Sequence, residues 1–248
     1  MILYNNFDIT PPRRTVVAIG SFDGVHRGHR TIIAHLKAMA ARLDAESVVV
    51  TFDPHPRIAL GKAPGMQLLT TVRERVIHLL VAGVDHVVVA HFDDAFRAQP
   101  YEAFVRDTLV AKLGMVGMIV GFDHRLGRGS EGTFERLKPL AEECGFDIER
   151  VEQYTTSGEG VSSTVVREAI LSGDMPSAER LLGGRYMLLG NVVRGIINDI
   201  DPYKLLPPSG RYRCRVERGA ESYETMATIS GRSVSLDNIP DGEVEVLF

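Results

Sequence analysis

Residues 15–29, TVVAIGSFDGVHRGH, decide the fold of this chain. Residues 16–19 are apolar and mostly β-branched, which predicts a strand buried on both faces. The next ten contain three glycines and two histidines. Apolar residues then recur at helical spacing over 32–43, so an amphipathic helix should follow directly. A buried strand, a glycine-rich turn and a helix form the opening unit of a parallel α/β sheet.

The same alternation continues along the chain. Apolar runs at 48–52, 87–90 and 118–120 alternate with segments of helical periodicity, and together they predict an α/β fold with a doubly wound, Rossmann-like parallel sheet. Helices are also expected near 163–171 and 176–182. Beyond them, short alternating runs separated by glycine and proline predict a small antiparallel, β-barrel-like module. We therefore expect two domains, residues 1–183 and 184–248.

Composition limits the kinds of partner. The 248 residues carry 28 basic and 32 acidic side chains, a formal charge of −4, which argues against a nucleic-acid-binding surface. No apolar run approaches the ~18 residues of a membrane helix, and no signal peptide is recognisable, so we expect a cytoplasmic protein without a membrane partner. Cys144 and Cys214 have no CxxC partner, which favours buried structural thiols over a disulfide or a metal site.

The turn after the first strand is the strongest candidate site. In parallel α/β sheets, ligands bind beyond the carboxyl ends of the strands. His26 and His29 lie three residues apart at a predicted helix start, and Gly28 between them allows close backbone approach. Free N–H groups at a helix start favour anions, so this turn predicts a phosphate site. The alternative is a pair of surface histidines beside an ordinary loop.

Two later turns add candidates. After the second strand, residues 51–57 (TFDPHPR) form a proline-stiffened loop against which a flat apolar ligand could lie, unless it is only a rigid turn. Residues 121–132 contain a GxGxxG match at Gly127, Gly129 and Gly132. A dinucleotide turn should open directly after its strand, but a polar segment intervenes, so a glycine-hinged flap is the better interpretation.

A second anion site is predicted at residues 161–168, VSSTVVRE. Capping of the helix explains one of the three hydroxyls, and Arg167 adds a forked donor suited to phosphate oxygens. The chain contains no P-loop, HExxH or GxSxG motif, so nucleoside-triphosphate binding by a P-loop, zinc-protease chemistry and covalent acyl transfer are not indicated.

These segments resemble a known family. His26-Arg27-Gly28-His29 matches the HxGH signature of nucleotidyltransferases, and the strings GSFDGVHRGH, TFDPHPR, GFDHRLGRGSEG and VSSTVVRE are similar to the FAD synthetase module of bacterial bifunctional riboflavin kinase/FAD synthetases. The resemblance covers about residues 15–183. It implies in-line adenylyl transfer from ATP to FMN, giving FAD and pyrophosphate, with Mg²⁺ carried by the phosphates rather than by dedicated protein ligands. The implied partners are the small molecules ATP, FMN and FAD.

The resemblance also implies roles for individual residues. His26, His29 and Arg167 would be catalytic, the histidines at the triphosphate and Arg167 at the outer phosphates. The nucleotide-binding residues would be Gly20, Phe22, Asp23, Gly24, His26, Gly28, His29, Asp123, Ser162, Ser163, Thr164 and Arg167. The flavin-binding residues would be Phe52, Pro54, His55, Pro56 and Arg125. No residue is assigned as a metal ligand.

Two departures from the family pattern leave alternatives open. The usual flap has phenylalanines where this chain has His124 and Leu126. The kinase module's Pro-Thr-Ala-Asn motif is missing from residues 194–204, so we expect riboflavin kinase activity to be lost. The alternatives are a nucleotidyltransferase with another phosphate acceptor, or a non-catalytic flavin- or nucleotide-binding protein.

Overall fold

The computed structural model describes residues 2–7, 14–156 and 159–248. The chain divides into two compact units, each built from separate stretches of sequence. The first unit comprises Met1–Phe22, Gly28–Gly65 and Val76–Gly160, and the second comprises Asp23–Arg27, Met66–Arg75 and Val161–Phe248. The domain boundary expected after residue 183 stays a prediction. The compact units divide the chain elsewhere, since the second one takes in both helices before that boundary.

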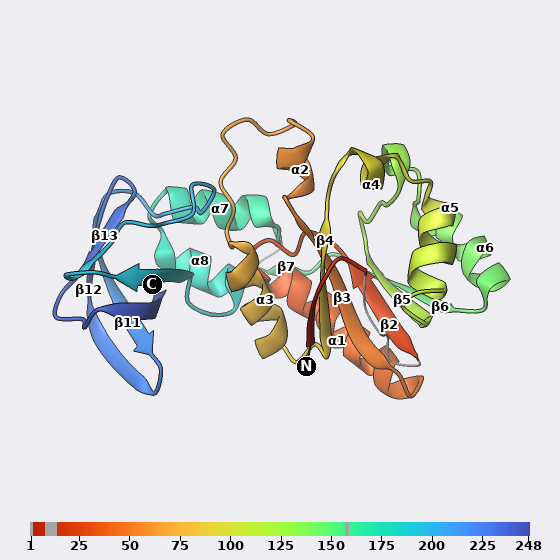
Figure 1. The fold of residues 1–248 in the computed structure, drawn as a ribbon, viewed down its shortest axis with the longest axis horizontal. Coiled ribbons are helices and arrows are strands. Elements are labelled where there is room, and N and C mark those ends of the chain that lie inside the picture. The colour runs from red at the N-terminus through yellow and green to blue at the C-terminus, as the bar shows by residue number, and fades with distance from the viewer. Residues whose placement is uncertain (1, 8–13, 157–158) are drawn as a thin grey trace. The chain divides into compact units, whose positions relative to one another are not determined.

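A six-stranded parallel sheet forms the first unit (Figure 1). Its strands run in the order β1 (Ile2–Asn5), β4 (His86–His91), β3 (Glu46–Asp53), β2 (Thr15–Ile19), β5 (Met115–Gly121) and β6 (Asp147–Val151). This topology confirms the predicted doubly wound α/β fold. The edge strands β1 and β6 were not foreseen. Strand β1 is largely exposed and β6 (DIERV) consists mostly of charged residues, so neither has the continuous apolar run that identifies the buried strands.

The helices of the first unit cover both faces of this sheet. Its elements are α1 (Arg27–Arg42), α2 (Pro56–Ala59), α4 (Asp94–Ala98), α5 (Tyr101–Ala103), the π-helix η1 (Phe104–Val110), the 3₁₀ turn η2 (Arg128–Ser130) and α6 (Phe134–Cys144), followed by a hairpin of β7 (Thr155–Thr156) and β8 (Glu159–Gly160). Helix α3 (Val72–Val81) is divided between the units, since residues up to Arg75 belong to the second one. Side chains of η1 and α6 share one core with Val17, Val50 and Met118. Helix α1 lies on the opposite face, where a Cβ on Gly117 would come within 2.7 Å of the Met39 sulfur. Glycine at this position therefore permits α1 to pack closely.

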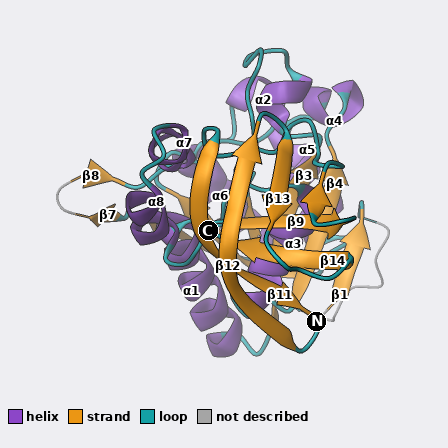
Figure 2. Ribbon diagram, turned by 90° about the vertical axis from the view of Figure 1, so that its left-hand side faces the viewer, coloured by secondary structure: helices purple, strands orange, loops and turns teal. Residues whose placement is uncertain are grey.

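The second unit combines two helices with an antiparallel sheet. Helices α7 (Ser163–Leu171) and α8 (Met175–Leu182) are both as predicted from the sequence. The strand order is β10 (Ile196–Ile197), β13 (Ser233–Leu236), β12 (Glu221–Ser230), β11 (Gly210–Arg218), β14 (Gly242–Leu247) and β9 (Met187–Val192). A bridge between Val193 and Ile196 joins the two ends of this order. The sheet is thus nearly closed, which confirms the predicted barrel-like module (Figure 2).

One hydrophobic core holds the second unit together. Val166 and Ile170 of α7 and Leu182 of α8 belong to the same buried cluster as Leu188 and Val216 of the antiparallel sheet. Burying side chains of this size contributes about 1.5–3 kcal/mol each, so α7 and α8 depend on the sheet for much of their stability.

The cysteines only partly match expectation. Cys214 is buried, and burial raises the pKa of its thiol to about 11, as suits an unreactive structural thiol. Cys144, at the end of α6, is only half-buried, because that last turn lies at the edge of the core.

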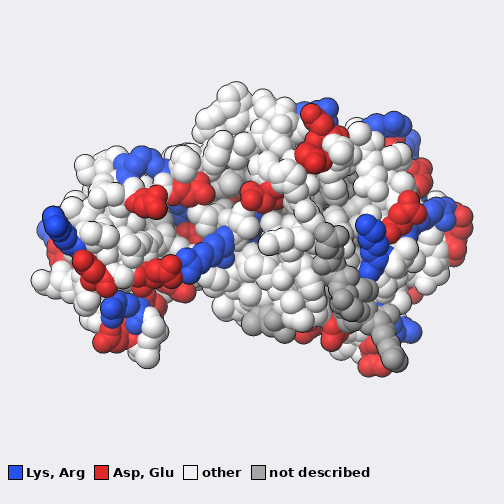
Figure 3. Space-filling view, in the orientation of Figure 1, with Lys and Arg blue, Asp and Glu red and all other residues white. Residues whose placement is uncertain are grey.

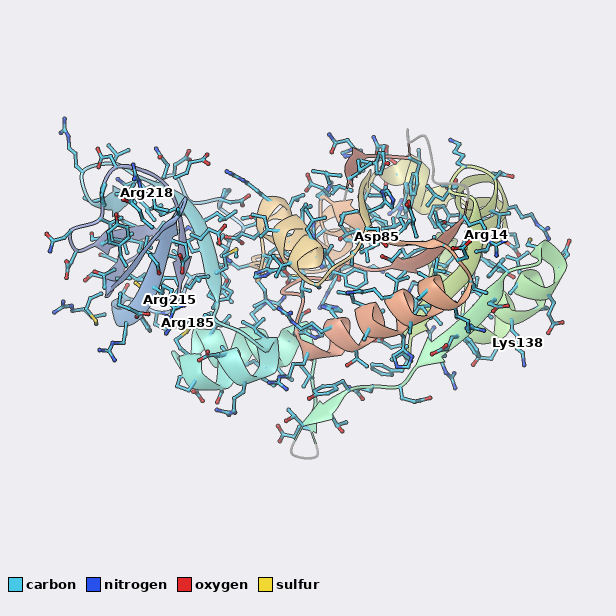
Figure 4. All side chains as sticks on the ribbon, turned by 90° about the horizontal axis from the view of Figure 1, so that it is seen from below. Arg14, Asp85, Lys138, Arg185, Arg215 and Arg218 are labelled. Carbon is cyan, nitrogen blue, oxygen red and sulfur yellow. The ribbon has the colours of Figure 1, made fainter. Side chains whose placement is uncertain are left out.

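Charged side chains are interspersed on the surface. On the face shown in Figure 3, basic and acidic groups alternate among uncharged residues. Arg185 and Arg215 of the second unit both approach Glu224, at 3.8 and 2.9 Å (Figure 4). Within the described part of the chain, none of the helices has both the length and the apolar character needed to cross a membrane.

Candidate functional site

The first unit presents its candidate residues where the strand order reverses. Strand β2 lies between β3 and β5, and the connections from this point run toward opposite edges of the sheet. The carboxyl ends of two such strands leave a crevice in which α/β proteins bind ligands. Gly20 follows β2 and Asp123 follows β5, so both lie beside this position.

The loop after β2 is fixed to the neighbouring strand. The Gly20 N–H donates to the Val50 carbonyl at 3.0 Å, and the Thr51 hydroxyl donates to the Ser21 carbonyl at 3.0 Å. Phe22 is buried with a left-handed backbone, at φ 48°, and its ring centre lies 5.0 Å from that of His29. His29 occupies the first turn of α1, as the sequence predicted, and Phe22 limits the positions that its ring can adopt.

Asp23 organises the part of this loop that belongs to the second unit. Its carboxylate is 1% exposed and accepts hydrogen bonds from the Leu69 N–H at 3.2 Å, from the Thr70 N–H at 3.0 Å and from the Thr70 hydroxyl at 3.2 Å. The Arg167 guanidinium adds an ion pair at 3.0 Å. The Asp23 charge is therefore satisfied by protein donors on both oxygens, as a buried charge requires.

The two residues after Asp23 have unusual backbone conformations. Gly24 has φ 82°, and a Cβ at this position would come within 2.6 Å of Leu69 Cδ1, so glycine is required both for conformation and for space. Val25 has φ 41° and is fully buried, although β-branched residues rarely occupy this region. Surrounding contacts must hold such a conformation, which is a common property of functional loops.

Burial favours the uncharged form of His26. The side chain is 5% exposed and lies directly before α1. Burial lowers the pKa of His26 to about 4, although the nearby Asp23 carboxylate partly opposes the shift. A neutral imidazole can donate one hydrogen bond from a ring nitrogen. His26 is thus prepared as a neutral donor rather than as a cation.

The start of α7 separates the three predicted hydroxyls. Ser162 caps the helix by accepting from the Val165 N–H at 3.4 Å, whereas the Ser163 hydroxyl donates to the Asp23 carbonyl at 2.9 Å. The Thr164 side chain is exposed. Arg167 donates through Nε to the Gln67 carbonyl at 2.9 Å and through Nη2 to Asp23. Asp23 therefore forms one hydrogen-bonded group with Ser163 and Arg167, which follow it by 140 and 144 residues.

The predicted flavin-binding residues fall on the first unit. Phe52 is buried, with ring centres of Phe92 and Phe96 each 5.5 Å away. A cis peptide bond precedes Pro54, and His55 caps the short helix α2, with Pro56 as its first residue, by accepting from the Arg57 N–H at 3.2 Å. Arg125 is exposed on the segment after β5, as is Asp123.

The segment 121–132 is tightly folded rather than extended. Leu126 is buried and exchanges two backbone hydrogen bonds with Gly132, at 3.2 and 2.8 Å. A Cβ on Gly127 or on Gly132 would come within 3 Å of Tyr101. These two glycines of the GxGxxG match therefore allow close packing against Tyr101. His124 is half-buried, and desolvation lowers its pKa to about 4.

The described residues do not include a protein cage for a metal ion. None of their histidine, cysteine, aspartate and glutamate side chains gather in a group of three that could hold one. Asp23, the buried carboxylate of this loop, already has its oxygens occupied by protein donors.

Sequence reasoning missed the groups that support this site. Leu69 and Thr70 supply the amides that bind Asp23, and Glu74 and Lys204 form a fully buried ion pair at 2.8 Å close to them. Neither charged residue lies in a recognisable motif. Burial of a charge depends on the tertiary contacts around it, so local sequence carried no signal for these positions.

The fold and this loop define a doubly wound α/β protein with a glycine-rich turn at the switch point of its sheet, the position at which such sheets bind ligands. A family profile described as FAD synthetase matches residues 8–165. The chain belongs to the FAD synthetase family, which confirms the predicted resemblance.

Individual relatives agree with this assignment. A bifunctional riboflavin kinase/FMN adenylyltransferase of Escherichia coli (strain K12) is 37% identical over 193 residues, and the match covers 77% of this chain and 61% of that protein. An enzyme of the same name from Pseudomonas fluorescens is 32% identical over 252 residues, covering 97% of this chain and 81% of the relative. The chain thus spans less than two thirds of the length of the E. coli relative.

One solved structure is similar over the whole chain. The crystal structure of a macrolide-efflux protein from Streptococcus pneumoniae has a TM-score of 0.86 and 26% sequence identity, and it covers 100% of this chain and 89% of that protein's chain. Both the parallel sheet and the barrel-like module therefore have a counterpart in that structure.

Proposed function

We propose that this protein is an FMN adenylyltransferase, which makes FAD and pyrophosphate from FMN and ATP. Membership of the FAD synthetase family is the observation that carries the proposal. The chemistry is in-line attack of an FMN phosphate oxygen on the α-phosphorus of ATP, with release of pyrophosphate. Catalysis of this kind depends on positioning and on stabilisation of charge, without a covalent enzyme intermediate.

The histidines of the glycine-rich loop have different roles in this proposal. His29, in the first turn of α1, donates to the triphosphate at the start of that helix, where the helix dipole favours an anion. His26 donates as a neutral imidazole, because burial keeps its pKa low. Both donors stabilise charge that develops on the transferred phosphorus and the leaving pyrophosphate.

The remaining site residues bind the two substrates. Thr164, exposed in the first turn of α7, and Arg167 bind the outer phosphates of ATP, while Ser163 holds the loop through the Asp23 carbonyl. Phe52, His55 and Pro56 contribute to the flavin site. The Mg²⁺ ion enters with ATP and screens the phosphate charge, which needs few ligands from the protein.

Incubation of the protein with MgATP and FMN, followed by chromatographic separation of the flavins, tests the proposal directly. We expect FAD to form. We also expect His29→Ala to lower kcat/KM. The decrease should correspond to a loss of about 2–4 kcal/mol of transition-state stabilisation, as for removal of an oxyanion donor. The matched control is His35→Ala, which removes a histidine from the same helix whose partner is Glu149, 2.5 Å away and partly exposed.

Either of two results would contradict this assignment. Absence of FAD above a control without enzyme would exclude the proposed activity, and a screen of other phosphate acceptors with pyrophosphate as the readout would then test a different acceptor. Nucleotide binding without pyrophosphate release would instead support a non-catalytic binding protein. An unchanged rate in His29→Ala would exclude the role given to His29.

We further propose that the barrel-like module has no riboflavin kinase activity. Residues 194–204 lack the Pro-Thr-Ala-Asn motif, and the tight turn at Arg194 and Gly195 connects β9 to β10 directly. With riboflavin and MgATP as the only substrates, we expect no FMN. Formation of FMN at a rate proportional to protein concentration would overturn this prediction.

A further inference from the structure

A buried ion pair, Glu74 with Lys204, lies behind the candidate nucleotide-binding loop in the second unit. Both side chains are 0% exposed, and the Lys204 ammonium lies 2.8 Å from a Glu74 carboxylate oxygen. A charge moved out of water costs several kcal/mol unless it is paired and fully hydrogen-bonded. The proposed reaction does not use either residue, so this pair calls for another role.

The donors of Lys204 all have acceptors. Besides Glu74, the ammonium donates to the Leu69 carbonyl at 2.6 Å and to the Met187 carbonyl at 2.6 Å, and it lies 4.1 Å from the centre of the Tyr186 ring. An ammonium has three N–H donors, and these three oxygens use them completely. Lys204 is therefore held in one position and in turn fixes the Leu69 carbonyl.

Glu74 is equally well satisfied. One carboxylate oxygen accepts from the Leu189 N–H at 2.8 Å, and the other accepts from Lys204 and from the Thr71 N–H at 2.8 Å. Leu189 belongs to β9 of the antiparallel sheet, whereas Thr71 directly precedes α3. The pair thus ties residues 66–75 to the barrel-like module.

Backbone hydrogen bonds reinforce the same connection. Leu68 pairs with Lys204 in a short parallel bridge, in which the Leu68 N–H donates to the Tyr203 carbonyl at 2.6 Å and the Leu205 N–H donates to the Leu68 carbonyl at 2.8 Å. Arg232 also donates to the Lys204 carbonyl at 2.6 Å. The Lys204 backbone is as firmly placed as its side chain.

The next residue connects this anchor to the site. Leu69 accepts from Lys204 with its carbonyl and donates to Asp23 with its N–H, at 3.2 Å. Asp23 in turn holds the Arg167 guanidinium, and its carbonyl accepts from Ser163. Only one residue, Leu69, therefore separates the buried ammonium from the group proposed to bind nucleotide phosphates.

We infer that Lys204 is a positioning residue for ATP: from the barrel-like module, and through Leu69, it holds Asp23 and Arg167 in the geometry that binds the nucleotide phosphates. This inference rests on the proposed adenylyltransferase function. It also gives the barrel-like module a role that does not require kinase chemistry.

The test replaces both charges together. Lys204→Met alone would leave Glu74 buried and unpaired, which can prevent folding, so the informative variant is Lys204→Met combined with Glu74→Gln. The matched control is Arg73→Met combined with Glu243→Gln. That pair also connects residues 66–75 to the antiparallel sheet, at 3.0 Å, but it is exposed, at 67% and 72%.

Three measurements distinguish a specific effect of Lys204 on ATP binding from a general loss of structure in the variant. We expect the KM for ATP to rise about tenfold in the Lys204/Glu74 variant, while the KM for FMN changes less than about twofold. The Kd for α,β-methylene ATP, which cannot transfer its adenylyl group, should rise by a similar factor. The amide hydrogens of Leu69 and Thr70 should exchange faster, since their acceptor Asp23 is less firmly placed. The control variant should match the wild type.

A milder variant provides a second route if the paired replacement does not fold. Thr70→Val keeps the side-chain shape but removes the hydroxyl that donates to Asp23 and accepts from the Gly24 N–H at 3.1 Å. We expect the same selective rise in the KM for ATP. An equal rise in the KM values for ATP and FMN, or unchanged Kd and exchange rates, would overturn the inference.

The outcomes also distinguish this inference from the proposed function. If the wild type makes no FAD but binds α,β-methylene ATP, the proposed function fails, and the comparison of Kd values still decides the role of Lys204. If the wild type binds no nucleotide, both are overturned.

Discussion

Asp23 shows how one buried charge determines the conformation of a loop. Its carboxylate is removed from water, so the chain must supply donors, and it does so with the Leu69 and Thr70 amides and with Arg167. Meeting this requirement brings residues 23, 69 and 167 together. The left-handed backbone of Val25 is maintained within the same loop.

The low pKa of His26 predicts a pH dependence of stability. The pKa falls from 6.5 to about 4 on folding, so between these values the unfolded chain binds a proton that the native protein does not. Stability contributed by neutral His26 is therefore present above pH 6.5 and is lost as the pH falls toward 4. We expect urea unfolding to show that the free energy of unfolding of the wild type falls by up to roughly 3 kcal/mol more than that of His26→Gln as the pH is lowered through this window.

Other titrating groups are common to both proteins in that comparison and cancel in the difference. Parallel curves of unfolding free energy against pH would show that His26 is not desolvated in solution.

At the scale of single elements, α7 combines a structural cap with a candidate phosphate site. Ser162 satisfies one free N–H of the first turn, whereas the exposed Thr164 leaves its hydroxyl accessible to a ligand. Its buried face, with Val166 and Ile170, belongs to the core of the second unit. The helix thus presents one face to the core and its N-terminus to the site.

The different roles of Ser162 and Thr164 predict different effects of substituting each residue. Ser162→Ala should lower the free energy of unfolding by about 1 kcal/mol, because the cap is lost, and Ser162→Thr should retain most of it. Thr164→Ala should leave stability nearly unchanged but raise the KM for ATP. Denaturant unfolding and steady-state kinetics on the same variants check both. A stability loss in Thr164→Ala without a change in the KM for ATP would contradict the assignment of capping to Ser162 and of phosphate binding to Thr164.

At the scale of the whole molecule, the structural units do not follow the order of the sequence. Residues 23–27 and 66–75 belong to the same unit as the barrel-like module, and so do α7 and α8. The apolar faces of these two helices are covered by residues from the antiparallel sheet, such as Leu188 and Val216. Residues 23–27 of the candidate nucleotide-binding loop therefore belong to a unit that extends beyond residue 183.

A fragment of residues 1–183 should consequently be less stable than the full chain. It removes the sheet that covers Val166, Ile170 and Leu182, and it also removes Lys204. We expect a lower Tm and stronger binding of a hydrophobic dye than in the full chain, because apolar surface is exposed. A fragment with the Tm of the full chain and unchanged ATP binding would show that the sequence-based boundary is the functional one.

The sequence by itself determined the doubly wound sheet, the barrel-like module, the helices at 163–171 and 176–182, and the family. Buried strands and amphipathic helices carry local patterns, and the turn at 20–29 carries a motif, so neighbouring residues suffice to identify them. The edge strands β1 and β6 were not predicted, because neither carries a continuous apolar run. Tertiary structure alone decided which unit the loop at 23–27 joins, that Arg167 pairs with Asp23, and that Glu74 and Lys204 lie buried together. Their charges are compensated by residues distant along the chain, and only folding brings those residues into contact.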